Sequence, residues 1–145
     1  MGDENENKII FNNFIEVLKN RDMERALSSF AEGAEWIAPE GKFSGKGEIE
    51  RYLKWFGDNI LAIRFADTGL ISQGNCAACE LVLEGNSDGE KWQVTALSVC
   101  EFVDGGIKNL RTVYDRLSVA RQVATEGLAG LAVSKIIERM EEGLN

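Results

Sequence analysis

Four strand-like runs follow one another between residues 60 and 116, and only short turn sequences separate them. The runs read ILAIRFADTGLIS, CAACELVLEG, EKWQVTALSVCEFV and IKNLRTVYDR. The segments between them, QGN, NSDG and DGG, carry the Gly, Asn and Asp residues that hairpin turns require. Because such short turns join antiparallel neighbours, the pattern predicts a four-stranded antiparallel meander.

Helix-spaced apolar residues precede this meander. Residues 9–18 carry Ile10, Phe14 and Leu18 at intervals of four, which predicts an amphipathic helix. The NRD sequence that follows interrupts the pattern, and Asp22 is suited to cap a second helix because its carboxylate can accept from free backbone N–H groups. The second helix would carry Met23, Ala26, Leu27 and Phe30.

A short strand and a third helix complete the first half of the chain. Residues 34–39 read AEWIAP and predict a strand that ends at Pro39, the only proline. The EGKFSGKG sequence that follows is expected to be a Gly-rich loop. Residues 48–58 predict a helix that Gly57 ends. Its apolar side would be formed by Ile49, Tyr52, Leu53 and Phe56.

Helical spacing returns after residue 118, with a break expected at Gly127 and Gly130. The repeat consists of Leu128, Leu131, Ala132, Lys135, Ile136 and Met140. Helices gathered on one side of an antiparallel sheet define an α+β fold. A length of 145 residues suits a single domain with a substantial core.

The charge balance excludes several kinds of partner. The chain carries 16 basic and 24 acidic residues, a net charge of -8. Nucleic acids and anionic membranes bind clustered Lys and Arg, so neither is expected as a partner. We see no secretory segment and no apolar run long enough to cross a bilayer, which favours a cytoplasmic location. The chain has no histidine, so acid–base chemistry would fall to carboxylates, Tyr, Cys or Lys.

The CAAC sequence resembles a metal or redox motif. On a strand, however, Cys76 and Cys79 would point to opposite faces. Without histidine and without a second cysteine pair, we expect no metal and no cofactor. An odd number of cysteines, completed by Cys100, favours free thiols.

Three stretches in this order resemble the nuclear transport factor 2-like superfamily. They are residues 14–39, residues 43–53 and EFVDGGIKNLRTVYDRLSVARQ at residues 101–122. The resemblance implies a curved antiparallel sheet and N-terminal helices that form a cone with an internal pocket. It further implies a SnoaL-like cone domain at residues 9–122. The polar opening MGDENENK predicts a flexible tail at residues 1–8. The helical spacing beyond the cone domain predicts an extra C-terminal helical extension at 123–145, packed on the domain or on a dimer partner.

Two enzyme groups of this superfamily can be compared residue by residue. The catalytic positions of ketosteroid isomerases fall on Phe14, Ala38 and Ser98, so no general base remains. The epoxide-hydrolase positions fall on Trp36, Ala38, Cys79, Leu81 and Thr112. No charged group remains there to polarise an epoxide or to deprotonate water, so both activities are disfavoured.

The SnoaL-like polyketide cyclases resemble the chain most in its YD…Q ending, and some use a carboxylate on the last strand. Tyr114 and Asp115 are therefore weak catalytic candidates. If Thr112 faces the pocket, strand alternation places Leu110 and Tyr114 there too and points Asp115 to the opposite face or the helix junction. A bulge would reverse this assignment. Without a bulge, Asp115 at the helix junction could cap the helix that follows or pair with an Arg.

The same alternation predicts a largely apolar pocket with a few small polar groups. Its candidate residues are Trp36, Tyr52, Trp55, Phe65, Cys79, Leu81, Ala96, Ser98, Leu110, Thr112 and Tyr114. Such a cavity suits a small hydrophobic ligand, such as a polycyclic, terpenoid or polyketide-like molecule. The alternative is that these side chains simply fill the cone.

The other sheet face is also apolar, through Leu97, Val99 and Val113. A sheet that is apolar on both sides needs a second cover, which favours a homodimer through this outer face. Three hypotheses follow: a protein that binds a small apolar molecule, a SnoaL-like isomerase or cyclase that uses Tyr114 and Asp115, and a non-catalytic dimerisation or interaction domain with a filled core.

Overall fold

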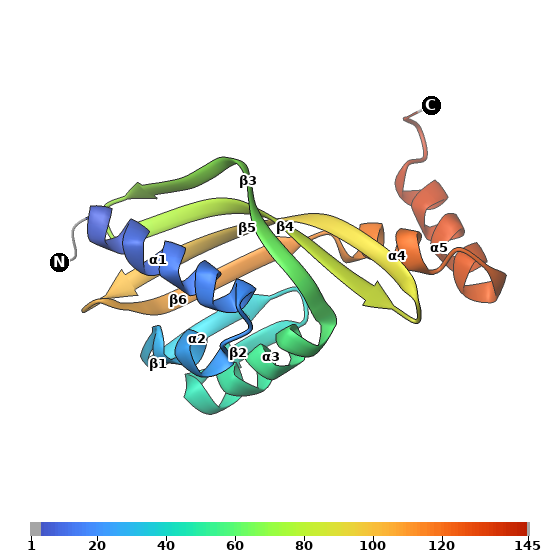
Figure 1. The fold of residues 1–145 in the computed structure, drawn as a ribbon. Coiled ribbons are helices and arrows are strands. Elements are labelled where there is room, and N and C mark those ends of the chain that lie inside the picture. Colours follow the sequence, from blue (N-terminus) through green and yellow to red (C-terminus); the bar gives the residue numbers. More distant parts are fainter. Residues whose placement is uncertain (1–3, 145) are drawn as a thin grey trace.

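The computed structural model describes residues 4–144, which fold as one curved sheet with helices against its concave side and a last helix that projects beyond its end (Figure 1). In chain order the elements are α1 (Glu4–Lys19), α2 (Met23–Ser28), β1 (Phe30–Ala38), β2 (Gly41–Ser44), α3 (Gly45–Asn59), β3 (Ile60–Gln73), β4 (Cys76–Ser87), β5 (Glu90–Val103), β6 (Gly106–Tyr114), α4 (Arg116–Val123) and α5 (Gly127–Met140). The predicted α+β class and the cone-shaped architecture are confirmed.

The sheet has six strands in the order β2-β1-β6-β5-β4-β3. Strands β3 to β6 pair antiparallel with their sequence neighbours, which confirms the predicted meander. β1 lies parallel to β6, so the sheet is mixed rather than wholly antiparallel. Turn sequences could not reveal this pairing because it joins two strands far apart in the chain.

Irregular pairing bends the sheet into a cone. Between β3 and β4 the register moves from Phe65↔Leu81 to Leu70↔Cys79, which leaves the intervening β3 residues bulged. Gly69 occupies a left-handed conformation within this bulge, with φ of 67°. A bulge increases the local twist and bend of a strand, and β3 curls over the concave side in Figure 1.

The first helix begins earlier than expected. Residues 4–8 of the predicted flexible tail are helical, while residues 1–3 lie outside the described part of the chain. Asn7 is buried and donates to the Gly74 carbonyl (3.3 Å), and the Glu4 carboxylate accepts from the Gly74 N–H (2.8 Å). These bonds hold the first turns of α1 against the β3–β4 hairpin.

The helix that Gly57 was expected to end continues to Asn59, so this boundary was wrong. Gly57 instead allows α2 to pack closely on α3, because a Cβ there would lie 2.9 Å from Met23 Cε. Asp22 caps α2 as predicted, accepting from the Arg25 N–H at 3.1 Å. Phe30 begins β1 rather than belonging to α2.

The Gly-rich loop predicted at residues 40–47 is largely a strand and a helix start. Ala38 pairs with Gly41, so Pro39 and Glu40 form a two-residue turn between β1 and β2. Proline suits the first position of such a turn because its φ is already fixed. The short hairpin brings the Glu40 carboxylate back toward the sheet.

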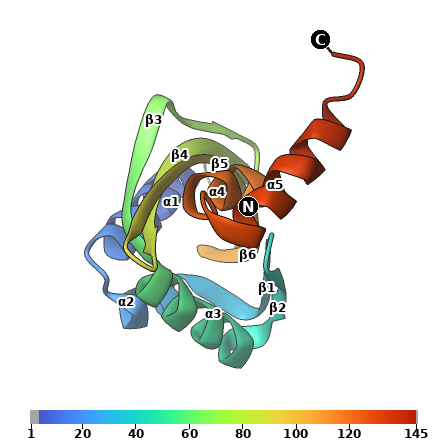
Figure 2. The ribbon, with the colours of Figure 1, turned by 90° about the vertical axis from the view of Figure 1, so that its right-hand side faces the viewer.

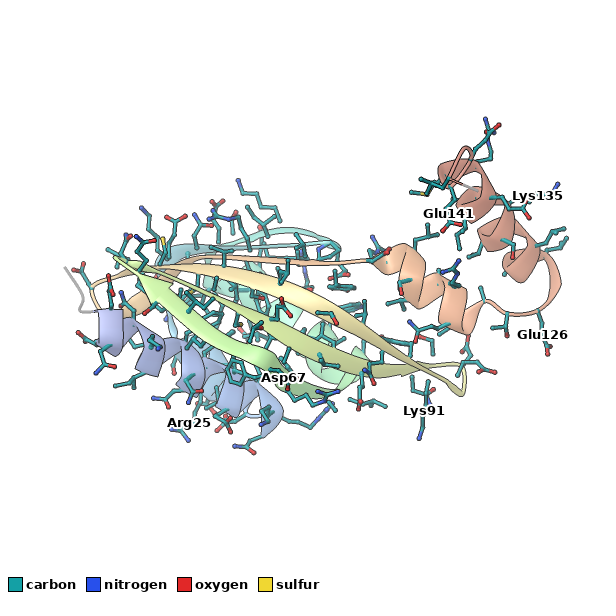
Figure 3. The ribbon with its side chains drawn as sticks, turned by 90° about the horizontal axis from the view of Figure 1, so that it is seen from above. Arg25, Asp67, Lys91, Glu126, Lys135 and Glu141 are labelled. Atoms are coloured by element: carbon teal, nitrogen blue, oxygen red, sulfur yellow. The ribbon has the colours of Figure 1, made fainter. Side chains whose placement is uncertain are left out.

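Two helices, α4 and α5, follow the last strand, and only α5 lies wholly within the predicted extension at residues 123–145. The break falls at residues 124–126, just before Gly127. Gly130 is buried against this connection, where a Cβ would lie 2.9 Å from the carbonyl carbon of Thr125. In Figure 3, α5 extends beyond the end of the sheet, with Glu126 at the turn before it. Among the described residues, none of the helices combines the length and apolar character of a membrane span.

Candidate functional site

The interior of the cone is packed with side chains. Trp36 Nε1 donates to Thr112 Oγ1 (3.1 Å), and Thr112 Oγ1 lies 3.1 Å from Ser98 Oγ. All three residues are buried, so the interior polar groups satisfy one another. The space left beside them is about 20 Å³, room for about one water molecule. Its lining is Phe11, Phe14, Ile15, Leu18, Trp36, Phe56, Ile63, Leu81, Leu83, Ser98, Leu110 and Thr112.

The positions that correspond to ketosteroid isomerase and epoxide hydrolase catalysts lie in this packed region. Phe14, Ala38, Ser98, Cys79, Leu81, Trp36 and Thr112 are all buried. None of these side chains is a carboxylate. Burial raises the pKa of the Cys79 thiol to about 12, so this thiol is protonated at neutral pH.

Open space lies instead at the mouth of the cone, where β6 ends and α4 begins. A cleft of about 160 Å³ is found there. Its lining, here called the mouth cleft, is Glu40, Trp55, Asn59, Ser87, Trp92, Tyr114, Arg116 and Val119. Figure 2 looks onto this end and shows α4 inside the outline formed by the curved sheet and α3.

Glu40 is the central polar group of the mouth cleft. Its carboxylate accepts one hydrogen bond from the Tyr52 hydroxyl, through Oε1, and another from the Tyr114 hydroxyl, through Oε2. Tyr52 comes from α3 and Tyr114 from the end of β6, so three separate elements meet at this carboxylate. The Glu40 side chain is only 15% exposed.

Burial and these bonds keep both phenols protonated. Burial, followed by the hydrogen bond to Glu40, raises the pKa of Tyr52 and of Tyr114 well above the usual range. Arg116 opposes this effect weakly, because its Nε lies 4.0 Å from Glu40 Oε2 and its side chain is 65% exposed. Arg116 also donates to the Pro39 carbonyl at 3.3 Å.

Aromatic side chains form the walls of the mouth cleft. Trp55 stacks on Tyr52, with ring centroids 5.4 Å apart, and Tyr52 stacks in turn on Phe43 at 4.3 Å. On β5, Trp92 lies over Gly85, where a Cβ would come within 2.1 Å of the indole. Gly85 therefore makes room for the indole that lines the cleft.

α4 covers one side of the mouth cleft. Asp115 caps this helix by accepting from the Ser118 N–H at 3.0 Å, which agrees with the predicted capping role and leaves Asp115 outside the cleft lining. The Gln122 side chain accepts from the Gln93 N–H and donates to the Gln93 carbonyl, both at 2.9 Å. The pairing of β5 with β6 ends at Ala96, so the backbone of Gln93 has no partner strand on this side. The Gln122 side chain makes the hydrogen bonds that a strand would otherwise make there.

The predicted pocket residues other than Phe65 are thus divided between the mouth cleft and the packed interior. Tyr114 and Trp55 line the mouth cleft, and Tyr52 binds its carboxylate. Phe65 is half-buried on β3. The rest of the predicted set lies in the packed interior: Trp36, Cys79, Leu81, Ala96, Ser98, Leu110 and Thr112.

Sequence reasoning missed six residues of the mouth cleft: Glu40, Asn59, Ser87, Trp92, Arg116 and Val119. Alternation along β5 placed Ala96 and Ser98 inside, and extending it by four residues from Ala96 would have found Trp92. Glu40 carried no comparable signal, since its phenol partner Tyr114 is 74 residues away.

The outer face of the sheet is exposed and apolar where predicted. Leu97 and Val113 are paired neighbours on β5 and β6, and both are at least half exposed. Val99 lies on the same face. Cys76 and Cys79 fall on opposite faces of β4, and all three cysteines are free thiols.

A family model described as a SnoaL-like domain matches residues 11–110. The chain therefore belongs to the SnoaL-like family, and the expected relationship is confirmed. No curated protein matches the chain.

Solved structures share the fold at low sequence identity. A proposed polyketide cyclase from Xanthomonas campestris pv. campestris is 16% identical, with a TM-score of 0.75 over 83% of this chain and 98% of that one. A nuclear transport factor 2-like protein from Burkholderia xenovorans is 19% identical, with a TM-score of 0.71 over 83% and 97%. TerC, co-crystallised with polyporic acid, is 19% identical, with a TM-score of 0.70 over 81% and 97%.

Proposed function

We propose that the chain binds a small organic molecule in the mouth cleft. The observation that carries this proposal is a carboxylate, Glu40, held by two phenols at the edge of an aromatic-walled cleft. A cavity of about 150 Å³ is known to hold benzene, so the cleft of about 160 Å³ suits one substituted ring. A polycyclic ligand would need the interior, where only about 20 Å³ is open.

The similarity to a proposed polyketide cyclase and to TerC, co-crystallised with polyporic acid, supports small-molecule binding in general. It does not select a ligand, because each of these two proteins is less than 25% identical in sequence to this chain. The aromatic lining and the single partly buried carboxylate support the narrower statement, namely a ring with one polar substituent.

A substitution that fills the mouth cleft tests whether the cleft is the binding site. Val119 lines the mouth cleft from α4, and Val119→Trp would occupy the space. We expect single-ring probes such as benzyl alcohol and benzylamine to bind the native protein and to lose affinity for this variant. Leu128→Trp, on the exposed side of α5, is the matched control. Unchanged binding to Val119→Trp, or no binding of any ring probe, would refute the proposal.

A second candidate function is proton transfer, favoured by the placement of Glu40 in the cleft. A carboxylate in a ligand cleft can act as general base, and the phenols that it releases on protonation can then donate to the ligand. This version replaces Asp115 by Glu40, because Asp115 caps α4. In this version Asp115 serves as the cap of α4, and Tyr114 is the partner of the base.

Nitrobenzisoxazole is a suitable probe of this base, because its ring opens when a base removes the proton on carbon. We expect the native protein to accelerate this reaction above buffer and Glu40→Gln to abolish the acceleration. Glu50→Gln, which removes an exposed charge from α3, should retain it. Equal rates for native protein and Glu40→Gln would rule out Glu40 as the base.

The third candidate is a dimerisation domain, which the packed interior and the apolar outer face both favour. We infer a homodimer in which the Leu97–Val113 surface is covered by a second copy. Light scattering should give a dimer mass for the native chain and a monomer mass for Val113→Asp. Ile9→Asp, at an exposed apolar position on α1, should remain dimeric. A native monomer at micromolar concentration would refute this interface.

A further inference from the structure

The hydrogen-bonding capacity left at Glu40 indicates what its ligand must offer. Each phenol has one proton to donate, and both Tyr52 and Tyr114 donate theirs to Glu40. The lone pairs that remain on the carboxylate and on the phenol oxygens can only accept. A ligand that binds at this point must therefore donate hydrogen bonds.

The charge at Glu40 is incompletely balanced. Arg116 is the basic side chain of the cleft lining, and its Nε lies 4.0 Å from Glu40 Oε2. At 65% exposure, an ion pair of this length contributes little and is screened by salt. The net charge of -8 adds a general attraction for cations.

The walls of the cleft favour a cation as well. Trp55 and Trp92 both line the space that opens beside Glu40. Indole faces attract ammonium groups electrostatically, and this attraction grows when water is excluded. Aromatic side chains form the cages by which proteins recognise organic ammonium ions, and the Glu40 carboxylate adds an opposite charge in this cleft.

From these observations we propose that the mouth cleft selects an organic cation: a single ring that carries a primary, secondary or tertiary ammonium group. The ammonium donates to Glu40 and displaces Arg116 from it, while the ring lies between the indoles. This inference rests on the proposed binding function and adds the chemical class of the ligand.

Three probes of matched size separate charge from shape. Benzylamine, benzyl alcohol and benzoate each place one polar substituent on a single ring, with charges of about +1, 0 and −1 at neutral pH. Isothermal calorimetry at fixed ionic strength should show benzylamine binding about tenfold more tightly than benzyl alcohol, because both probes can donate to Glu40 but only benzylamine adds the attraction of a positive charge. Benzoate should bind most weakly.

Two variants act in opposite directions. Glu40→Gln keeps the size of the side chain and should remove the advantage of benzylamine over benzyl alcohol, with Glu50→Gln as the charge-matched control. Arg116→Gln removes the competing cation at an exposed position and should tighten benzylamine binding. Lys8→Gln, exposed on α1, is its control. If Glu40→Gln proved unstable, Arg116→Gln would still test the proposal.

The outcomes distinguish this inference from the binding function beneath it. If benzylamine and benzyl alcohol bind equally and Val119→Trp weakens both, the mouth cleft is a binding site without cation selectivity, and the inference is overturned. If benzoate binds most tightly and Arg116→Gln weakens it, the cleft is an anion site, and the inference is again overturned. If no probe binds, both the inference and the binding function fail.

Discussion

The Tyr114 hydroxyl, at the end of β6, donates to the carboxylate of Glu40 in the β1–β2 turn. Since β1 lies parallel to β6, the turn that follows β1 reaches the same end of the sheet as Tyr114. The bond therefore depends on the fold as a whole. It places a partly buried carboxylate at the mouth of the cone, beside the cleft under α4.

The two tyrosines of the chain, Tyr52 and Tyr114, should not ionise at their ordinary pKa of about 10 while the protein is folded. Burial and Glu40 raise both pKa values, so the folded state keeps its phenol protons where the unfolded state loses them. The raised pKa values therefore contribute to the free energy of unfolding in full below about pH 10, and this contribution is lost as the pH rises further.

Absorbance at 295 nm should therefore stay flat through pH 10 and rise only together with the loss of circular dichroism. Protein unfolded in guanidinium should show the ordinary titration. A rise near pH 10 with native dichroism would contradict the arrangement around Glu40.

One cysteine should react much faster than the other two. Burial raises the pKa of Cys79 to about 12 and that of Cys100 still further, so neither supplies thiolate at pH 8. Cys76 is partly exposed. Ellman's reagent should label one thiol per native chain and all three after unfolding, and Cys76→Ser should remove the fast reaction. Rapid labelling of two or three thiols in the native protein would contradict the burial of Cys79 and Cys100.

Two glycine substitutions should have opposite effects on stability. Gly85→Ala places a methyl group 2.1 Å from the Trp92 indole and should lower the free energy of unfolding by about 1–3 kcal/mol. Gly47→Ala lies in α3 with open space around its Cβ and should raise stability by about 0.5–1 kcal/mol. Urea denaturation measures both, and equal effects would contradict the contact between Gly85 and Trp92.

Much of the fold could be predicted because its determinants are local. Turn residues defined the four strands of the meander, and alternation correctly separated the buried Ser98 and Thr112 from the exposed Leu97 and Val113. Gly57 misled the prediction, because a helical glycine that allows close packing has the same appearance in sequence as one that ends a helix.

The candidate site could be predicted only in part. Alternation states which side chains point inward, but it does not state whether they meet. Trp36 and Thr112 are hydrogen-bonded to each other in the packed interior, whereas Trp55 and Trp92 line an open cleft. Glu40 could not be assigned, because its role depends on the parallel pairing of β1 with β6.

Gln122 should control the mobility of α4. Gln122→Ala removes both bonds to the Gln93 backbone, at a cost of about 1–3 kcal/mol for α4 docking. Hydrogen exchange should accelerate at the Gln93 amide and across α4, while the β3–β4 hairpin stays unchanged. Arg121→Ala, at the exposed neighbouring position, should leave exchange unaltered. Unchanged exchange in Gln122→Ala would show that α4 is held by other contacts.

The location of the binding site is tested most directly by fluorine NMR of protein labelled with fluorotryptophan. The three tryptophans report on two regions: Trp36 on the packed interior, Trp55 and Trp92 on the mouth cleft. Single Trp→Phe variants assign the three resonances. During titration with benzylamine, the Trp55 and Trp92 resonances should shift to saturation while that of Trp36 moves least. A saturable shift of Trp36 alone would place the ligand inside the cone and contradict a functional site at Glu40.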